Sequence, residues 1–152
     1  MSDNVLSVIP TDPCWQPGYD SAANAVHALR AVTPEDDGTR AEWTETMMFV
    51  ACGSNFERLF CPECDSVLDQ MWWRDLFCDL PDVLDRTELL DITVPCCGAQ
   101  LSMNDLAYDW PCGFARFEIS IWNPGRSWLS DSELAAVGEA LGYPVRQILA
   151  HW

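Results

Sequence analysis

Phe60-Cys61-Pro62-Glu63-Cys64-Asp65 and Val94-Pro95-Cys96-Cys97-Gly98-Ala99 are the two stretches that decide the fold this sequence predicts. Each stretch holds two cysteines in what reads as a tight turn. Proline restricts the backbone of the first turn, and glycine permits the left-handed backbone with which the second can end. We interpret the two turns as the halves of one site that closes across the intervening insert.

The residues of these turns predict a zinc site, because zinc prefers four soft ligands in a tetrahedron and thiolates serve best. The first turn resembles the Cys-Pro-x-Cys knuckle of zinc ribbons. The second departs from it, since a regular knuckle would have cysteine where Val94 stands. We expect the ligands to be Cys61, Cys64, Cys96 and Cys97. The residues that could replace Cys96 as the fourth ligand are Cys52, Cys78, Cys112 and Asp65.

Three other interpretations of these cysteines stay open. Cys61 and Cys64 could form a redox pair, because an extended segment precedes them and a helical pattern follows. The cysteines could instead be buried apolar side chains or disulfide partners. The zinc interpretation is preferred because the double cysteine pattern is the more specific signal. Four thiolates would leave no open coordination position, so the expected zinc is structural.

Composition and charge restrict the classes of partner. The chain has 152 residues, 49% of them apolar, and its 24 acidic and 8 basic residues give a net charge of −16. This charge argues against nucleic-acid binding, because phosphates would be repelled. It favours a basic protein partner, or serves solubility alone. The eight basic residues are all arginine, which suggests a GC-rich bacterial genome.

The segment at the start of the sequence and the cysteine usage predict a cytoplasmic protein. Met1-Ser2-Asp3-Asn4 lacks the basic and apolar regions of a signal peptide. The sequence holds no apolar run of the ~20 residues that a membrane span needs. In a reducing cytoplasm, thiols bind metal more often than they form disulfides.

The two ends of the chain show similar patterns. Each reads as strand, proline-containing loop with tryptophan, helix and strand, with a capping box at Ser130 and Glu133 in the second. Two such β-α-β halves predict an α+β, ferredoxin-like sheet with both helices on one face. We therefore expect a single domain over residues 1–152, with a zinc-ribbon-like, metal-binding insertion at 56–110 between the halves.

Three local expectations concern the middle of the chain. Residues 43–51 and 56–60 are predicted to form a β-hairpin that leads into the first cysteine turn. Apolar residues at helical spacing predict a helix over 66–80. Within residues 101–110, Asn104 and Asp105 indicate a turn or short helix.

No pattern of catalytic residues stands out. His27 and His151 are interpreted as surface or packing residues, and the sequence has neither a glycine-rich phosphate loop nor a His-Glu-x-x-His motif. Tryptophan is common at binding hot spots. Of the eight tryptophans, the candidates for exposed binding residues are Trp73, Trp122 and Trp128.

The whole chain resembles a group of small, uncharacterised bacterial proteins that combine Cys-Pro-x-Cys and Pro-Cys-Cys-Gly with a Tyr-Asp-Trp-Pro turn, here residues 108–111. That resemblance implies the fold and the metal, and no activity. The leading hypothesis is a zinc-stabilised binding protein that masks a basic partner, as immunity proteins and other small inhibitors do. The alternatives are a thiol-redox or metal-dependent enzyme at Cys61 and Cys64, and a structural subunit of an oligomer.

Overall fold

A four-stranded antiparallel sheet forms the centre of the computed structural model, which describes residues 2–152. The strand order is β2-β8-β1-β9, so the two central strands come from opposite ends of the chain. Every pair of neighbours is antiparallel. The strands are β1 (Asn4–Pro10), β2 (Thr39–Val50), β8 (Gly113–Trp122) and β9 (Val145–His151).

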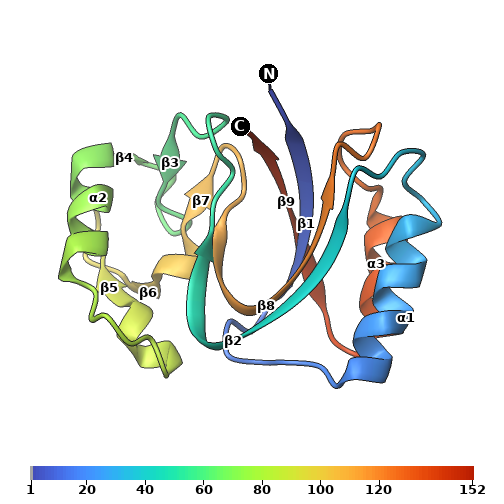
Figure 1. The fold of residues 1–152 in the computed structure, drawn as a ribbon. Coiled ribbons are helices and arrows are strands. Elements are labelled where there is room, and N and C mark those ends of the chain that lie inside the picture. The colour runs from blue at the N-terminus through green and yellow to red at the C-terminus, as the bar shows by residue number, and fades with distance from the viewer. Residues whose placement is uncertain (1) are drawn as a thin grey trace.

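Helices α1 (Tyr19–Arg30) and α3 (Asp131–Leu141) lie side by side and cover one face of this sheet (Figure 1). The alternation along β8 explains the packing, because Phe117, Ile119 and Ile121 all point into the core beneath the helices. The predicted capping box is confirmed: Ser130 Oγ accepts a hydrogen bond from the Glu133 backbone, and the Glu133 carboxylate accepts one from the Ser130 backbone. This box begins α3, and a left-handed glycine ends it.

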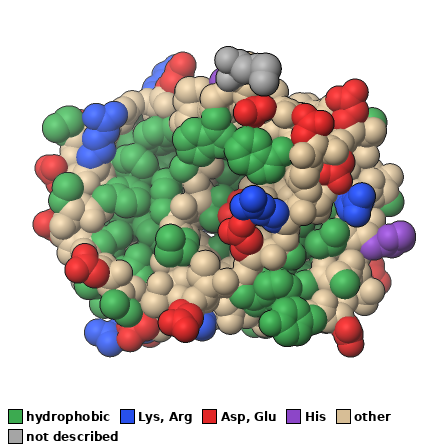
Figure 2. Space-filling view, viewed as in Figure 1, with side chains coloured by type: hydrophobic (Ala, Val, Ile, Leu, Met, Phe, Trp, Pro, Cys, Tyr) green, Lys and Arg blue, Asp and Glu red, His purple; other side chains and the backbone are tan. Residues whose placement is uncertain are grey.

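The chain between β2 and β8 forms a second body of structure on the other side of the sheet (Figure 1). It contains a three-stranded sheet of order β4-β3-β7 and a separate β5-β6 hairpin. Hydrophobic side chains gather in a hollow between α2 and β2 (Figure 2). The elements are β3 (Leu59–Phe60), β4 (Val67–Leu68), α2 (Gln70–Asp79), the 3₁₀ turn Thr87–Leu90, β5 (Asp91–Thr93), β6 (Gln100–Ser102), the 3₁₀ turn Met103–Asp105 and β7 (Ala107–Tyr108).

The inserted segment shares its core with the four-stranded sheet. Met47 of β2 and Phe114 of β8 pack with Leu90 and Met103 of the insertion in one buried cluster. The chain just after β2 also runs along β9, where Gly53 bridges to His151. The insertion therefore covers part of the sheet face that the helices leave open.

Two local predictions for this segment are wrong. Residues 56–60 do not pair with β2; Leu59 and Phe60 pair with β4 and β7 in another sheet, and the neighbour of β2 is β8. The helix predicted over 66–80 begins only at Gln70, because Asp69 caps it by accepting a hydrogen bond from the Met71 backbone. The preceding Val67–Leu68 is strand β4.

The α+β class is confirmed, with antiparallel sheets and three α-helices in the described chain. The prediction of a turn or short helix at Asn104 and Asp105 is also confirmed, by the second 3₁₀ turn. Among residues 2–152, no helix has the length and apolar character to cross a membrane.

Candidate metal centre

The first cysteine turn lies at the tip of the β3–β4 hairpin. The Cys61 backbone N–H donates to the Ser66 carbonyl at 2.9 Å, and the Asp65 N–H donates to the Cys61 carbonyl at 2.9 Å. Asp65 has a φ of 60°, in the left-handed region. Aspartate tolerates that region better than most residues, because its short polar side chain can hydrogen-bond locally.

The second turn repeats this backbone pattern at the tip of the β5–β6 hairpin. The Val94 N–H donates to the Ala99 carbonyl at 3.0 Å, and the Gly98 N–H donates to the Val94 carbonyl at 3.0 Å. Gly98, with a φ of 74°, takes the left-handed position. Val94 therefore occupies the place that Cys61 has in the first turn, and both side chains are fully buried.

The four sulfur atoms meet between the two hairpin tips. All lie within 4.8 Å of one another. Cys61 Sγ is 3.8 Å from Cys97 Sγ, and Cys64 Sγ is 3.4 Å from Cys96 Sγ. A tetrahedral zinc with Zn–S bonds of about 2.3 Å would hold its sulfurs about 3.8 Å apart. The four cysteines are free thiols, and their arrangement could hold a metal ion.

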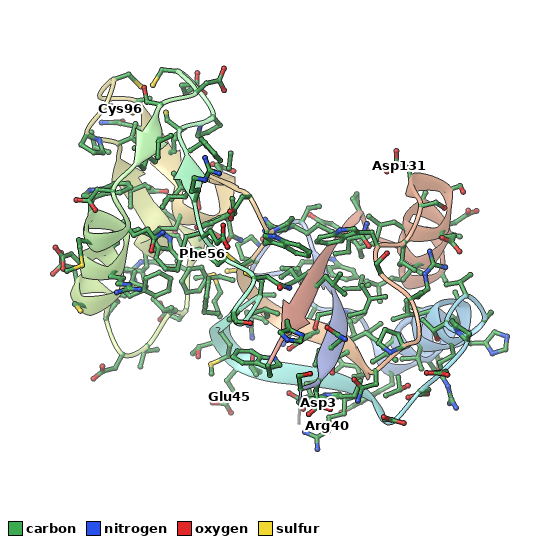
Figure 3. All side chains as sticks on the ribbon, turned by 90° about the horizontal axis from the view of Figure 1, so that it is seen from above. Asp3, Arg40, Glu45, Phe56, Cys96 and Asp131 are labelled. Carbon is green, nitrogen blue, oxygen red and sulfur yellow. The ribbon has the colours of Figure 1, made fainter. Side chains whose placement is uncertain are left out.

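The cluster sits at the outer edge of the insertion, above a small apolar core. Sulfur atoms gather around Cys96 at the tip of the insertion, far from Asp131 of α3 (Figure 3). Cys61 is buried, whereas the other three cysteines are exposed. The buried side chains beneath the turns are Leu59, Leu68, Val94 and Leu106.

The thiols of the cluster have unequal acidities. The Ser66 side chain and backbone, followed by Cys96, lower the pKa of Cys64 to about 6. Desolvation, followed by the neighbouring sulfurs, raises the pKa of Cys96 to about 12. Thiolates this close repel one another, so a bound cation would favour the thiolate forms by offsetting their charge.

Cys96, rather than any of the alternative fourth ligands, completes the group of four. Cys52 and Cys112 are buried in a different cluster, between β2, β8 and β9. Cys78 is exposed and, like Asp65, does not belong to the group that residues 2–152 bring together.

The three candidate tryptophans lie in different surroundings. Trp122 is 38% exposed at the end of β8. Trp73 is half-buried, and its Nε1–H donates to the Tyr108 hydroxyl at 3.2 Å. Trp128 is half-buried and stacks on Trp110, with ring centroids 5.3 Å apart. A role for any of them in binding stays a prediction.

One polar feature was missed by reasoning from the sequence. Glu118 lies on the sheet face opposite the helices, where the Ser7 hydroxyl donates to its Oε2 at 2.6 Å. Burial, opposed by this hydrogen bond, raises the pKa of Glu118. The alternation of β8 had placed Glu118 on the polar face of its strand, and that was the available signal. What it could not show is that Ser7 of β1 and Glu42 of β2 flank Glu118 on that face.

No protein-family model, curated protein or solved structure shows significant similarity to this chain. The resemblance to a bacterial group therefore stays a prediction.

Proposed function

We propose that this protein is a zinc-stabilised binding protein whose target is a basic protein, as in immunity proteins and other small inhibitors. The observation that carries the proposal is the group of four thiols within 4.8 Å, built from two matching hairpin turns. Four sulfur ligands would close the coordination sphere, which suits a structural ion and leaves no position for water.

Zinc is the ion that this donor set favours. An all-thiolate tetrahedron excludes magnesium and calcium, which require oxygen ligands. Cys61, Cys64, Cys96 and Cys97 would hold the zinc, and the ion would supply charge neutralisation and a cross-link between the hairpins. The paired hairpins support a zinc-ribbon-like insertion, although Val94 replaces one cysteine of a regular ribbon.

The proposed framework for this insertion is a ferredoxin-like sheet. The order β2-β8-β1-β9, the antiparallel pairing and the two helices on one face support it. Both β-α-β units run from a central strand to an edge strand, which is the arrangement that two such units adopt. The insertion then joins the two units.

Charge supports a basic partner. Four ion pairs occur among residues 2–152, and they engage four of the eight arginines. Most of the 24 acidic side chains therefore have no basic partner among the described residues 2–152. Residues 61–112 alone hold eleven acidic residues against two arginines, which places much of the excess charge on the insertion. Such a surface attracts basic proteins and speeds their association.

A second candidate function is a thiol-redox or metal-dependent enzyme at Cys61 and Cys64. It is favoured by the exposure of Cys64 and by its pKa of about 6, because the thiolate is the reactive form. The sulfur contacts favour metal instead: Cys61 lies against Cys97, and Cys64 against Cys96. Both close contacts thus join different hairpins, as a shared ion requires.

Zinc content and thiol reactivity test the metal half of the proposal. Protein purified without added metal is expected to carry one zinc per chain and to release four thiols on chelation. A chain without metal that forms a reversible Cys61–Cys64 disulfide would overturn the zinc assignment in favour of the redox enzyme.

The proposed binding to a basic protein is tested with the purified protein and a purified partner. A partner captured on the immobilised protein would be identified, purified and titrated by calorimetry at about 50 and 500 mM salt, because screening weakens charge attraction between the two. We expect a basic partner whose affinity falls at high salt. An affinity independent of salt, or a partner that is acidic, would contradict the proposal.

A further inference from the structure

The half of the open sheet face that the insertion leaves uncovered carries a row of polar side chains. In the strand register, Arg40 lies opposite Ser120, which lies opposite Ser7. Glu42 lies opposite Glu118 in the neighbouring row. These five residues line a groove of about 310 Å³, here called the sheet groove. Arg40 marks this margin of the sheet, far from the cysteine cluster at Cys96 (Figure 3).

The floor of the sheet groove holds polar groups that the fold does not fully satisfy. Ser120 is only 8% exposed, and its hydroxyl makes no hydrogen bond with any of residues 2–152. Ser7 is 2% exposed, and its hydroxyl donates a hydrogen bond to Glu118 Oε2. The other carboxylate oxygen, Glu118 Oε1, also has no hydrogen-bond donor in the described chain. Neither this oxygen nor the Ser120 hydroxyl is among the fully buried polar atoms without a partner in residues 2–152, so both reach the solvent in the groove and are open to a ligand.

Two indole rings border the same groove. Trp122 is 38% exposed and Trp152 is 57% exposed, and both line the sheet groove. The face of an indole ring attracts cations, most strongly where water is excluded. Exposed tryptophans that line one groove together with a carboxylate therefore favour a ligand that is both flat and positively charged.

The charge of the sheet groove also favours a positively charged ligand. Arg40 pairs with Glu42 at 3.3 Å and offsets its charge, and within the part of the chain that the structure describes Glu118 has no basic partner. Burial, and to a smaller extent Glu42, raises the pKa of Glu118. A carboxylate kept in such a place lowers the stability of the fold at neutral pH, and groups of this kind are concentrated at functional sites.

We propose that the sheet groove binds an arginine side chain of the partner protein, with the guanidinium against Glu118 and the Trp122 and Trp152 rings. Guanidinium fits better than ammonium because it is planar, stacks on aromatic rings, is weakly hydrated and presents several donors. Ser120 can accept one of these donors. That the arginine comes from a protein rests on the proposed basic partner. The binding of a guanidinium group in the groove does not depend on that proposal.

The test uses a small probe, N-acetyl-arginine amide, followed through the indole N–H signals of the protein by NMR. Variants W122F and W152F assign the two signals. We expect both signals to shift saturably with the arginine probe and to stay in place with N-acetyl-citrulline amide, its uncharged counterpart. E118Q should weaken binding by about tenfold or more, the loss expected for one charge-assisted hydrogen bond.

The matched control is E139Q, which makes the same substitution at an exposed position of α3, on the other side of the sheet. It should leave the affinity for the probe unchanged. A second variant, W152A, removes an exposed ring at the end of the chain and should also weaken binding. The proposal is overturned if the citrulline probe binds equally, or if E118Q binds the arginine probe like the unmodified protein. Since no protein partner is needed, this result is independent of the capture and titration experiment.

Discussion

Removing the Cys96 thiol should weaken zinc binding, and a cysteine at position 94 should restore most of the lost affinity. Structural zinc binding is worth about 10–16 kcal/mol at neutral pH, so an equal share for each of four thiolates is about 3 kcal/mol. C96A should therefore weaken zinc binding by about a hundredfold. The loss would show that Cys96 contributes like a ligand.

The restoring change, V94C, follows from the backbone of the two turns. Val94 and Cys61 occupy equivalent positions, with matching hydrogen bonds and complete burial. A thiol at 94 in the C96A background should therefore reach the ion as Cys61 does. Shortening the buried valine costs about 1 kcal/mol. The double variant is expected to recover most of the loss and to stay about fivefold weaker than the unmodified protein.

Competition with a chromophoric zinc chelator at fixed pH measures these affinities, and elemental analysis gives the zinc content. C78A is the control, because Cys78 is an exposed thiol outside the cluster. Its affinity should match the unmodified protein. The reasoning fails if C96A binds zinc as tightly as C78A does, or if adding V94C to C96A recovers nothing.

Three further predictions concern stability and are checked by urea unfolding. Arg126, followed by hydrogen bonds from Ser130, lowers the pKa of Glu133 from 4.5 to about 2. The charged carboxylate therefore stabilises the fold above pH 4.5, and this contribution is lost as pH falls through about 2. E133Q should remove that part of the acid dependence, and an unchanged profile would contradict the assignment. G53A should destabilise the fold by about 1–3 kcal/mol, because the Gly53 backbone is left-handed and the new Cβ would lie 2.1 Å from the His151 carbonyl oxygen. An unchanged unfolding midpoint would show that the bridge between Gly53 and His151 can relax. E118Q should raise the free energy of unfolding at pH 7. Because the pKa of Glu118 is raised in the fold, its charge destabilises the fold; this destabilisation is absent below pH 4.5 and complete above the folded pKa. A lower stability of E118Q at pH 7 would mean that the charge of Glu118 is satisfied in the fold.

The elements that could be predicted are those with a complete local signal. β8 alternates apolar and polar residues along its length, and α3 has its capping box at one end and a left-handed glycine at the other. The predicted hairpin of residues 43–51 with 56–60 is wrong because strand pairing is not local. β2 pairs with β8, far along the chain, and Leu59 and Phe60 pair with β4 and β7 in another sheet.

The start of α2 shows a competition that propensity does not resolve. Apolar residues at helical spacing extend back to Val67, yet Val67 and Leu68 pair with β3. Asp69 then caps the helix through its side chain. The hairpin that carries the cysteine turn needs its second strand, so tertiary pairing overrides the helical pattern at this end.

By itself, the sequence determined the α+β class, the two matching cysteine turns and the acidic surface, because spacing, alternation and charge are properties of neighbouring residues. Only the tertiary structure decided that Cys96 joins the other three cysteines and that Cys52, Cys78 and Cys112 stay apart. It also placed Glu118 in a groove between strands from both ends of the chain. The reason is that both sites form from segments whose distance in space depends on how the hairpins and the sheet pack.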